Sequence, residues 1–120
     1  MFSLGSGSRY FMCQHPVNMR KGIDSLFSLV ISESPLTPMN GDVFVFFSRD
    51  RHSVKILRWD VDGFLLYQKR LERGSFELPS RDPATGYYEL PWETFTLIMG
   101  GVCLDSVRFR KRYRSRIVGI

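Results

Sequence analysis

Apolar residues fill both sides of the strands predicted between positions 42 and 71, and this feature constrains the fold most. The runs 44–47 (Phe-Val-Phe-Phe) and 64–66 (Phe-Leu-Leu) are apolar at consecutive positions. Because successive side chains of a strand point to opposite faces, a sheet with one face in water would alternate apolar and polar residues. Either helices cover both faces or one face meets another subunit. We expect a sheet with a helix packed on at least one face.

Local patterns predict the other elements. The β-forming residues and the turns between them predict strands over 9–13, 42–47, 54–59, 64–71 and 75–78, the last four as an antiparallel meander. Asn18 is a candidate N-cap for a helix that ends near residue 32, since apolar residues follow it at helical spacing. Pro91 suits the first turn of a second helix over 92–99, which Gly100 ends. Residues 80–88 are expected to form a polar loop.

These elements predict a single α+β domain: a mainly antiparallel sheet of four to five strands, two helices and a basic C-terminal arm. The expected divisions are a flexible N-terminus over 1–8, the domain over 9–105 and the arm over 106–120. No apolar run approaches the roughly 20 residues needed to cross a bilayer, and no secretory signal is evident, so a cytoplasmic, nucleoid-associated protein is expected.

The basic charge is concentrated in the arm. The chain carries 17 basic and 12 acidic residues, and six of the basic ones fall within the last 13 positions, where no acid occurs. Arginine recurs there at every second position: Arg108, Arg110, Arg112, Arg114 and Arg116. In an extended chain this spacing places all five guanidinium groups on one side, roughly 6.6–6.8 Å apart, close to the spacing of phosphates along a nucleic-acid strand. The alternatives are a tail that aids solubility and a strand added to an acidic protein.

Further basic residues accompany the predicted first helix and the hairpins. Those near the hairpins form either a groove wall for phosphates or gatekeepers that keep an apolar sheet from aggregating. Arg20 and Lys21, expected in the first turn of the helix where basic charge opposes its dipole, either serve a ligand or are solvated surface charge. The candidates are Arg20, Lys21, Arg49, Arg51, Lys55, Arg58, Lys69 and Arg70.

The residues suggest no enzyme, cofactor or metal. Asp60 and Asp62 flank the hairpin turn before Gly63, where turn formation is a better explanation than a metal pair or a nuclease site. His15 and His52 lack a companion at ligand spacing, and the two cysteines, Cys13 and Cys103, lie far apart.

A longer pattern resembles a known family. The segment 18–26 (Asn-Met-Arg-Lys-Gly-Ile-Asp-Ser-Leu) is similar to the signature D-M-R-K-G-x-D-x-L of the accessory protein encoded by the second open reading frame of insertion-sequence sixty-six elements, with Asn18 in place of aspartate. The resemblance continues through 41–46, 54–60 and 62–76, and it is less specific over 90–104. It implies a role in transposition beside a separate transposase, and it supplies no catalytic residues.

We therefore expect a non-catalytic accessory protein of a bacterial insertion sequence that binds the DNA backbone, the transposase or both. The alternative is a protein-interaction module without direct DNA contact, for which Trp59 and Phe64 on the apolar sheet are candidate partner-binding residues. The basic and aromatic positions shared with the family are Arg20, Lys21, Lys55, Arg58, Trp59, Lys69 and Arg70.

Overall fold

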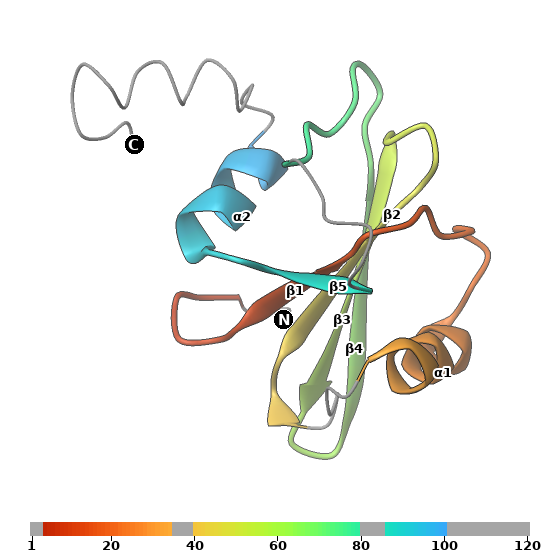
Figure 1. Cartoon of the computed structure of the whole chain (residues 1–120), viewed down its shortest axis with the longest axis vertical. Helices are drawn as coiled ribbons and strands as arrows, with labels where there is room; N and C mark the ends of the chain where they lie inside the picture. Colours follow the sequence, from red (N-terminus) through yellow and green to blue (C-terminus); the bar gives the residue numbers. More distant parts are fainter. Residues whose placement is uncertain (1–3, 35–39, 80–85, 101–120) are drawn as a thin grey trace.

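The computed structural model describes residues 4–34, 40–79 and 86–100, which contain five strands and two helices (Figure 1). Neither helix has the length and apolar character needed to cross a membrane. The expected α+β class is confirmed. In chain order the elements are β1 (Tyr10–Cys13), α1 (Ile23–Glu33), β2 (Val43–Phe47), β3 (Ser53–Asp60), β4 (Gly63–Arg70), β5 (Tyr87–Leu90) and α2 (Trp92–Met99).

The strands form one sheet in the order β4-β3-β2-β1-β5. As predicted, β2, β3 and β4 form an antiparallel meander. The first strand, β1, lies parallel to β2, and β5 pairs antiparallel with the other side of β1. Parallel neighbours need a crossover connection, and α1 lies in the connection between β1 and β2. The sheet is therefore mixed but mainly antiparallel, as expected.

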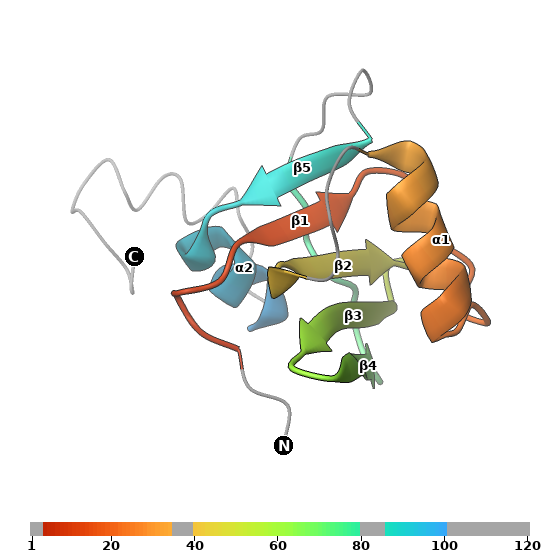
Figure 2. The same ribbon diagram turned by 90° about the horizontal axis from the view of Figure 1, so that it is seen from below.

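Each face of the sheet is covered by one helix, which explains why the strands lack alternation (Figures 1 and 2). The side chains of Phe44 and Phe46 pack under α1, while those of Val43, Val45 and Phe47 pack on the α2 side. The buried part of the α1-side core consists of Phe11, Cys13, Val17, Leu26, Val30, Phe44, Phe46 and Leu57. The buried part of the α2-side core consists of Tyr10, Met12, Val43, Val45, Phe47, Val54, Ile56, Phe76, Leu90, Phe95 and Ile98. Burying one such large apolar side chain contributes about 1.5–3 kcal/mol.

The prediction for the last part of the sheet was wrong. Residues 75–78 are not a strand. Residues 87–90 form β5, although 87 and 88 were expected to end the loop over 80–88. Phe76 explains the apolar signal of the first segment, because its ring is buried in the α2-side core while its amide donates to the carbonyl of Arg51 at 2.8 Å. An irregular segment thus covers the sheet where a strand was expected.

The helix boundaries are partly as predicted. Residues 92–99 form α2 as expected, after Pro91. The first helix begins later than expected, since Gly22 is its N-cap. Asn18 caps the preceding turn instead: its Oδ1 accepts from the amide of Arg20 at 2.8 Å, and its carbonyl accepts from the amide of Lys21 at 3.1 Å. Arg20 and Lys21 therefore precede the helix and do not lie in its first turn as expected.

Candidate nucleic-acid interface

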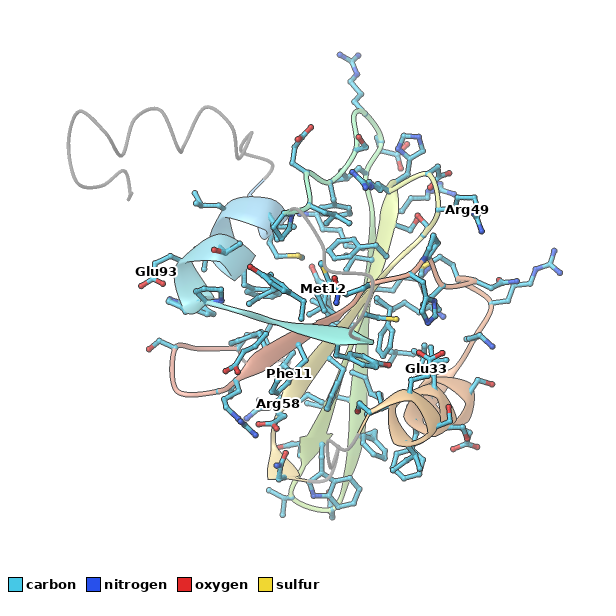
Figure 3. The ribbon with its side chains drawn as sticks, viewed as in Figure 1. Phe11, Met12, Glu33, Arg49, Arg58 and Glu93 are labelled. Carbon is cyan, nitrogen blue, oxygen red and sulfur yellow. The ribbon has the colours of Figure 1, made fainter. Side chains whose placement is uncertain are left out.

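Seven basic side chains gather at one end of the sheet, which we call the basic end. The strand register explains this, because β1 and β2 finish there and the pairing of Ser53 with Arg70 brings the end of β4 to the same place. Figure 3 shows Arg49 at this end and Arg58 toward the other. The side chains are at least partly exposed, and together they are Arg20, Lys21, Arg49, Arg51, Lys69, Arg70 and Arg73.

A hydrogen-bonded turn holds the centre of the basic end. The carboxylate of Asp50 accepts from the Ser48 hydroxyl at 2.7 Å and from the His52 amide at 3.0 Å. These hydrogen bonds, that from the His52 backbone first, lower the pKa of Asp50, so the carboxylate stays charged while serving the turn. Arg51 adopts a left-handed backbone with φ of 60°, which the turn imposes on a residue that does not favour it.

Two long-range contacts fix the turn and the loop before α1 to the sheet. His52 Nδ1 lies 2.7 Å from the carbonyl of Gly74, which docks the segment after β4 against the turn. Lys55 is only 6% exposed, and its ammonium donates to the carbonyl of Lys21 at 2.6 Å. Lys55 was predicted as a surface contact for phosphate, but the structure uses its charge to hold Lys21 in place.

A hollow of about 570 Å³ opens between the turn and the loop that precedes α1. Arg49 lines it on one side, and Asn18 and Met19 line it on the other. Among the described residues Arg49 has no carboxylate within ion-pair distance, whereas Arg70 lies 3.8 Å from Glu72. The basic end therefore offers cations at the rim of a concave surface, which suits an extended anion.

The other predicted residues lie elsewhere. Arg58 pairs with Val43 at the start of β2, away from the basic end. Trp59 and Phe64 are half-buried on the α1 side, where their rings meet edge to face at 5.0 Å and Phe64 also lies 5.3 Å from Phe27 of α1. Phe64 therefore joins the sheet to α1, and Trp59 packs against Phe64. Arg108, Arg110, Arg112, Arg114 and Arg116 lie outside the described residues.

The hairpin between β3 and β4 forms as its sequence predicts. Asp60 pairs with Gly63 across it, and the amide of Asp62 donates to the carbonyl of Asp60. Val61 occupies the turn with φ of 53° and a side chain 88% exposed. Both carboxylates are on exposed residues. The turn-forming interpretation of Asp60 and Asp62 agrees with this geometry.

One cluster of side chains was not predicted from the sequence. His15 was expected to lack a ligand-spaced companion, but the structure brings Cys13 and Glu33 to it, with the three potential ligand atoms within 4.8 Å of one another. The Cys-x-His spacing was visible in the sequence. The approach of Glu33 to His15 was not visible, because it depends on how α1 crosses the sheet.

Comparisons with known proteins agree with the resemblance carried by the sequence motifs. The model of the family described as IS66 Orf2 like protein matches residues 8–109. Two proteins of Sinorhizobium fredii (strain NBRC 101917 / NGR234) are similar. Uncharacterized protein y4jC is 31% identical over 112 residues, which cover 93% of this chain and 92% of the relative. Uncharacterized protein y4hO is 34% identical over 82 residues, which cover 68% of this chain and 71% of the relative. No solved structure matches the chain.

Proposed function

Since the chain belongs to the family of IS66 Orf2-like proteins, an accessory family of insertion sequences, we propose that it assists transposition by binding the DNA backbone. The observation that supports this step is the basic end, where the cations Arg20, Arg49 and Lys69 extend from three different segments of the chain. Backbone binding needs cations held on a firm surface, and the hydrogen-bonded turn around Asp50 supplies that support.

The arginine arm would extend this surface. Its five alternating guanidinium groups follow α2 in the sequence, and in an extended form they would track one strand of the duplex. In that extended form the arm would contribute a line of charge, whereas the basic end contributes a concave patch. The two contributions could therefore be separated. Cations that contact phosphates carry no sequence information directly, so little sequence preference is expected.

The first test measures the binding of duplex DNA over a range of salt concentrations. The full chain should bind with a steep salt dependence, and truncation after Asp105 should flatten the slope of log K against log salt by about 4–5 if all five arginines contact phosphates. A truncated chain that binds DNA as the full chain does would remove the arm from the mechanism. Full-chain binding that is insensitive to salt would contradict the proposal as a whole.

A matched pair of variants tests the basic end itself. Arg49→Gln and Val61→Asp both lower the net charge by one, at opposite ends of the sheet. We expect Arg49→Gln to weaken binding several-fold and to reduce the salt slope by about 1, and Val61→Asp to leave the affinity within about twofold. Equal losses would mean that DNA responds to net charge and not to this surface.

A second candidate function is a protein-interaction module that contacts the transposase. The observation that favours it is strand β4, which pairs only with β3 among the described strands and so has an open edge that another chain could extend. Phe64 lies on this strand and Trp59 lies opposite it. A pull-down with the transposase, with and without nuclease treatment, separates the functions: a complex that survives nuclease and weakens in Phe64→Ala favours the interaction module.

A further inference from the structure

Three metal-ligating side chains meet where β1 ends. Cys13 is the last residue of β1, His15 follows two residues later, and Glu33 is the last residue of α1. The Cys13 sulfur lies 3.6 Å from His15 Nε2, and the same nitrogen lies 2.8 Å from Glu33 Oε1. One ring nitrogen thus faces a thiol and a carboxylate together, from two different elements of the fold.

The other nitrogen of His15 indicates how the ring is used. Nδ1 lies 3.1 Å from the carbonyl oxygen of Pro16, which accepts but cannot donate a hydrogen bond. Nδ1 therefore carries a proton, and in the neutral ring the lone pair belongs to Nε2. A lone pair directed at a carboxylate oxygen needs a positive species between them, either a second proton or a metal ion. An imidazole that donates from one nitrogen to a backbone carbonyl and coordinates through the other is the usual arrangement of a zinc-ligating histidine.

The separations from His15 Nε2 to the other two ligand atoms are near those around a tetrahedral zinc ion. Ordinary zinc–ligand bond lengths place a thiolate sulfur about 3.6 Å from an imidazole nitrogen, and that nitrogen about 3.3 Å from a carboxylate oxygen. The distance between Cys13 and His15 already matches at 3.6 Å. The carboxylate of Glu33 would have to withdraw by about half an ångström, which a side chain at a helix end can do by rotation.

The surroundings leave room for a fourth ligand. A hollow of about 210 Å³ borders Cys13 and His15, and Arg49 and Arg51 also line it. Tyr87, opposite Cys13 in the sheet, has a buried hydroxyl oxygen with no hydrogen-bond partner of ordinary geometry among the described residues. This phenolic hydroxyl is a hydrogen-bond donor that can serve a thiolate or a bound water.

We propose that Cys13, His15 and Glu33 bind a zinc ion whose fourth position takes water or an anion. A thiolate and a carboxylate neutralise the two charges of the ion, and the thiol proton passes to solvent on binding. The bound ion joins the end of β1 to the end of α1, on either side of the loop that carries Arg20 and Lys21. This inference does not depend on DNA binding.

The test uses the metal-free full chain with cobalt(II) as a probe, since tetrahedral cobalt bound to a thiolate absorbs strongly and zinc displaces it. One equivalent should produce the thiolate-to-cobalt absorption, and zinc should abolish it. Cys13→Ser should remove the absorption, and His15→Gln and Glu33→Gln should each weaken cobalt binding by about tenfold or more. Matched controls are Cys103→Ser and His52→Gln, each of which should behave as the unaltered chain.

Several outcomes would overturn the proposal. They are the lack of a thiolate absorption in the unaltered chain, its persistence in Cys13→Ser, and its loss in Cys103→Ser. Because Cys13 is buried, its substitution can perturb folding, which circular dichroism of the metal-free variant would reveal. In that event His15→Gln decides the question, since His15 is exposed and outside the core: unchanged cobalt affinity in this variant would refute the site.

Discussion

The two ends of the sheet use their charged residues in opposite ways. At the basic end the carboxylate of Asp50 accepts two hydrogen bonds within the turn, while Arg49 extends outward. At the end that carries the β3–β4 hairpin, Arg9 is bound to Asp42 at 3.0 Å, and the carboxylates of Asp60 and Asp62 face solvent. Both ends therefore contain both signs of charge. The two ends differ in the sign of the charge that remains available to a partner.

This difference teaches that net charge alone says little about where a small basic protein binds. The Arg9–Asp42 pair raises the pKa of the guanidinium through a hydrogen bond, and the same pair cancels its field. Lys55 at the basic end is likewise withdrawn from the surface by Lys21. Burial and pairing, which composition does not report, decide which cations are available.

The largest effect on stability is expected from removing the buried ammonium group of Lys55, which lies next to the basic end. Lys55→Met keeps the length of the side chain but leaves the carbonyl of Lys21 without its donor, so we expect a loss of about 1–3 kcal/mol in the free energy of unfolding. Urea denaturation would measure it. The control is Lys69→Met on the neighbouring strand, an exposed site where a change within about 0.5 kcal/mol is expected. Equal stability of Lys55→Met and the unaltered chain would contradict the role given to Lys55.

The second prediction moves charge from one end to the other. Arg49→Glu combined with Asp62→Lys leaves the net charge unchanged, so binding governed by net charge would be unaffected. We expect DNA affinity to fall roughly tenfold and the salt slope to fall by about 1, as in Arg49→Glu alone. Fluorescence anisotropy with a short duplex measures both quantities. Full restoration of affinity by Asp62→Lys would abolish the distinction between the ends.

The third prediction compares two tyrosines, one toward each end. Burial raises the pKa of Tyr10 and of Tyr87, so the folded chain keeps phenolic protons that the unfolded chain loses above about pH 10. Stability should therefore fall as pH rises beyond that value. Tyr87→Phe should remove more of this fall than Tyr10→Phe, because the pKa of Tyr87 is raised further. Denaturation midpoints measured from pH 8 to 11, as approximate limits, test this order; a larger effect of Tyr10→Phe would reverse it.

The smallest effect concerns the turn of the β3–β4 hairpin. Val61 is a β-branched residue with φ of 53°, a conformation that asparagine adopts more easily. Val61→Asn should raise the free energy of unfolding by about 0.5–1 kcal/mol and leave DNA affinity unchanged. Asp62→Asn, at a position without positive φ, controls for the introduction of the amide. A loss of stability in Val61→Asn would show that Val61 is not strained.

The parts of the fold that could be predicted are those determined by neighbours in the sequence. The meander from β2 to β4 follows from the turn residues around Gly63, and α2 follows from Pro91. Strand β5 was missed because its four residues form a strand by pairing with β1, which is distant in the sequence. Residues 75–78 were mistaken for a strand because Phe76 is an apolar residue that the core buries. The apolar faces did predict a covered sheet, but the choice between helices and a second subunit required the structure.

The same distinction between near and distant residues applies to the candidate site. The basic residues around the first hairpin could be grouped from the sequence, since few residues separate them. Strand register places Arg58 at the other end of the sheet. The path of the loop before α1 buries Lys55. The meeting of Cys13 and Glu33 at His15 was invisible for the same reason: 18 residues separate the histidine from the carboxylate.

The position of β1 in the sheet has a consequence for how the protein is made. Tyr10, near the beginning of the chain, pairs with Leu90, near the end of the described part, so one edge of a central strand lacks its partner until most of the polypeptide has left the ribosome. Contacts between such distant residues slow folding, and an unpaired apolar strand is prone to aggregation in the meantime. Synthesis rate and chaperone supply should therefore influence the yield of this protein more than that of one whose first strand pairs with an immediate neighbour.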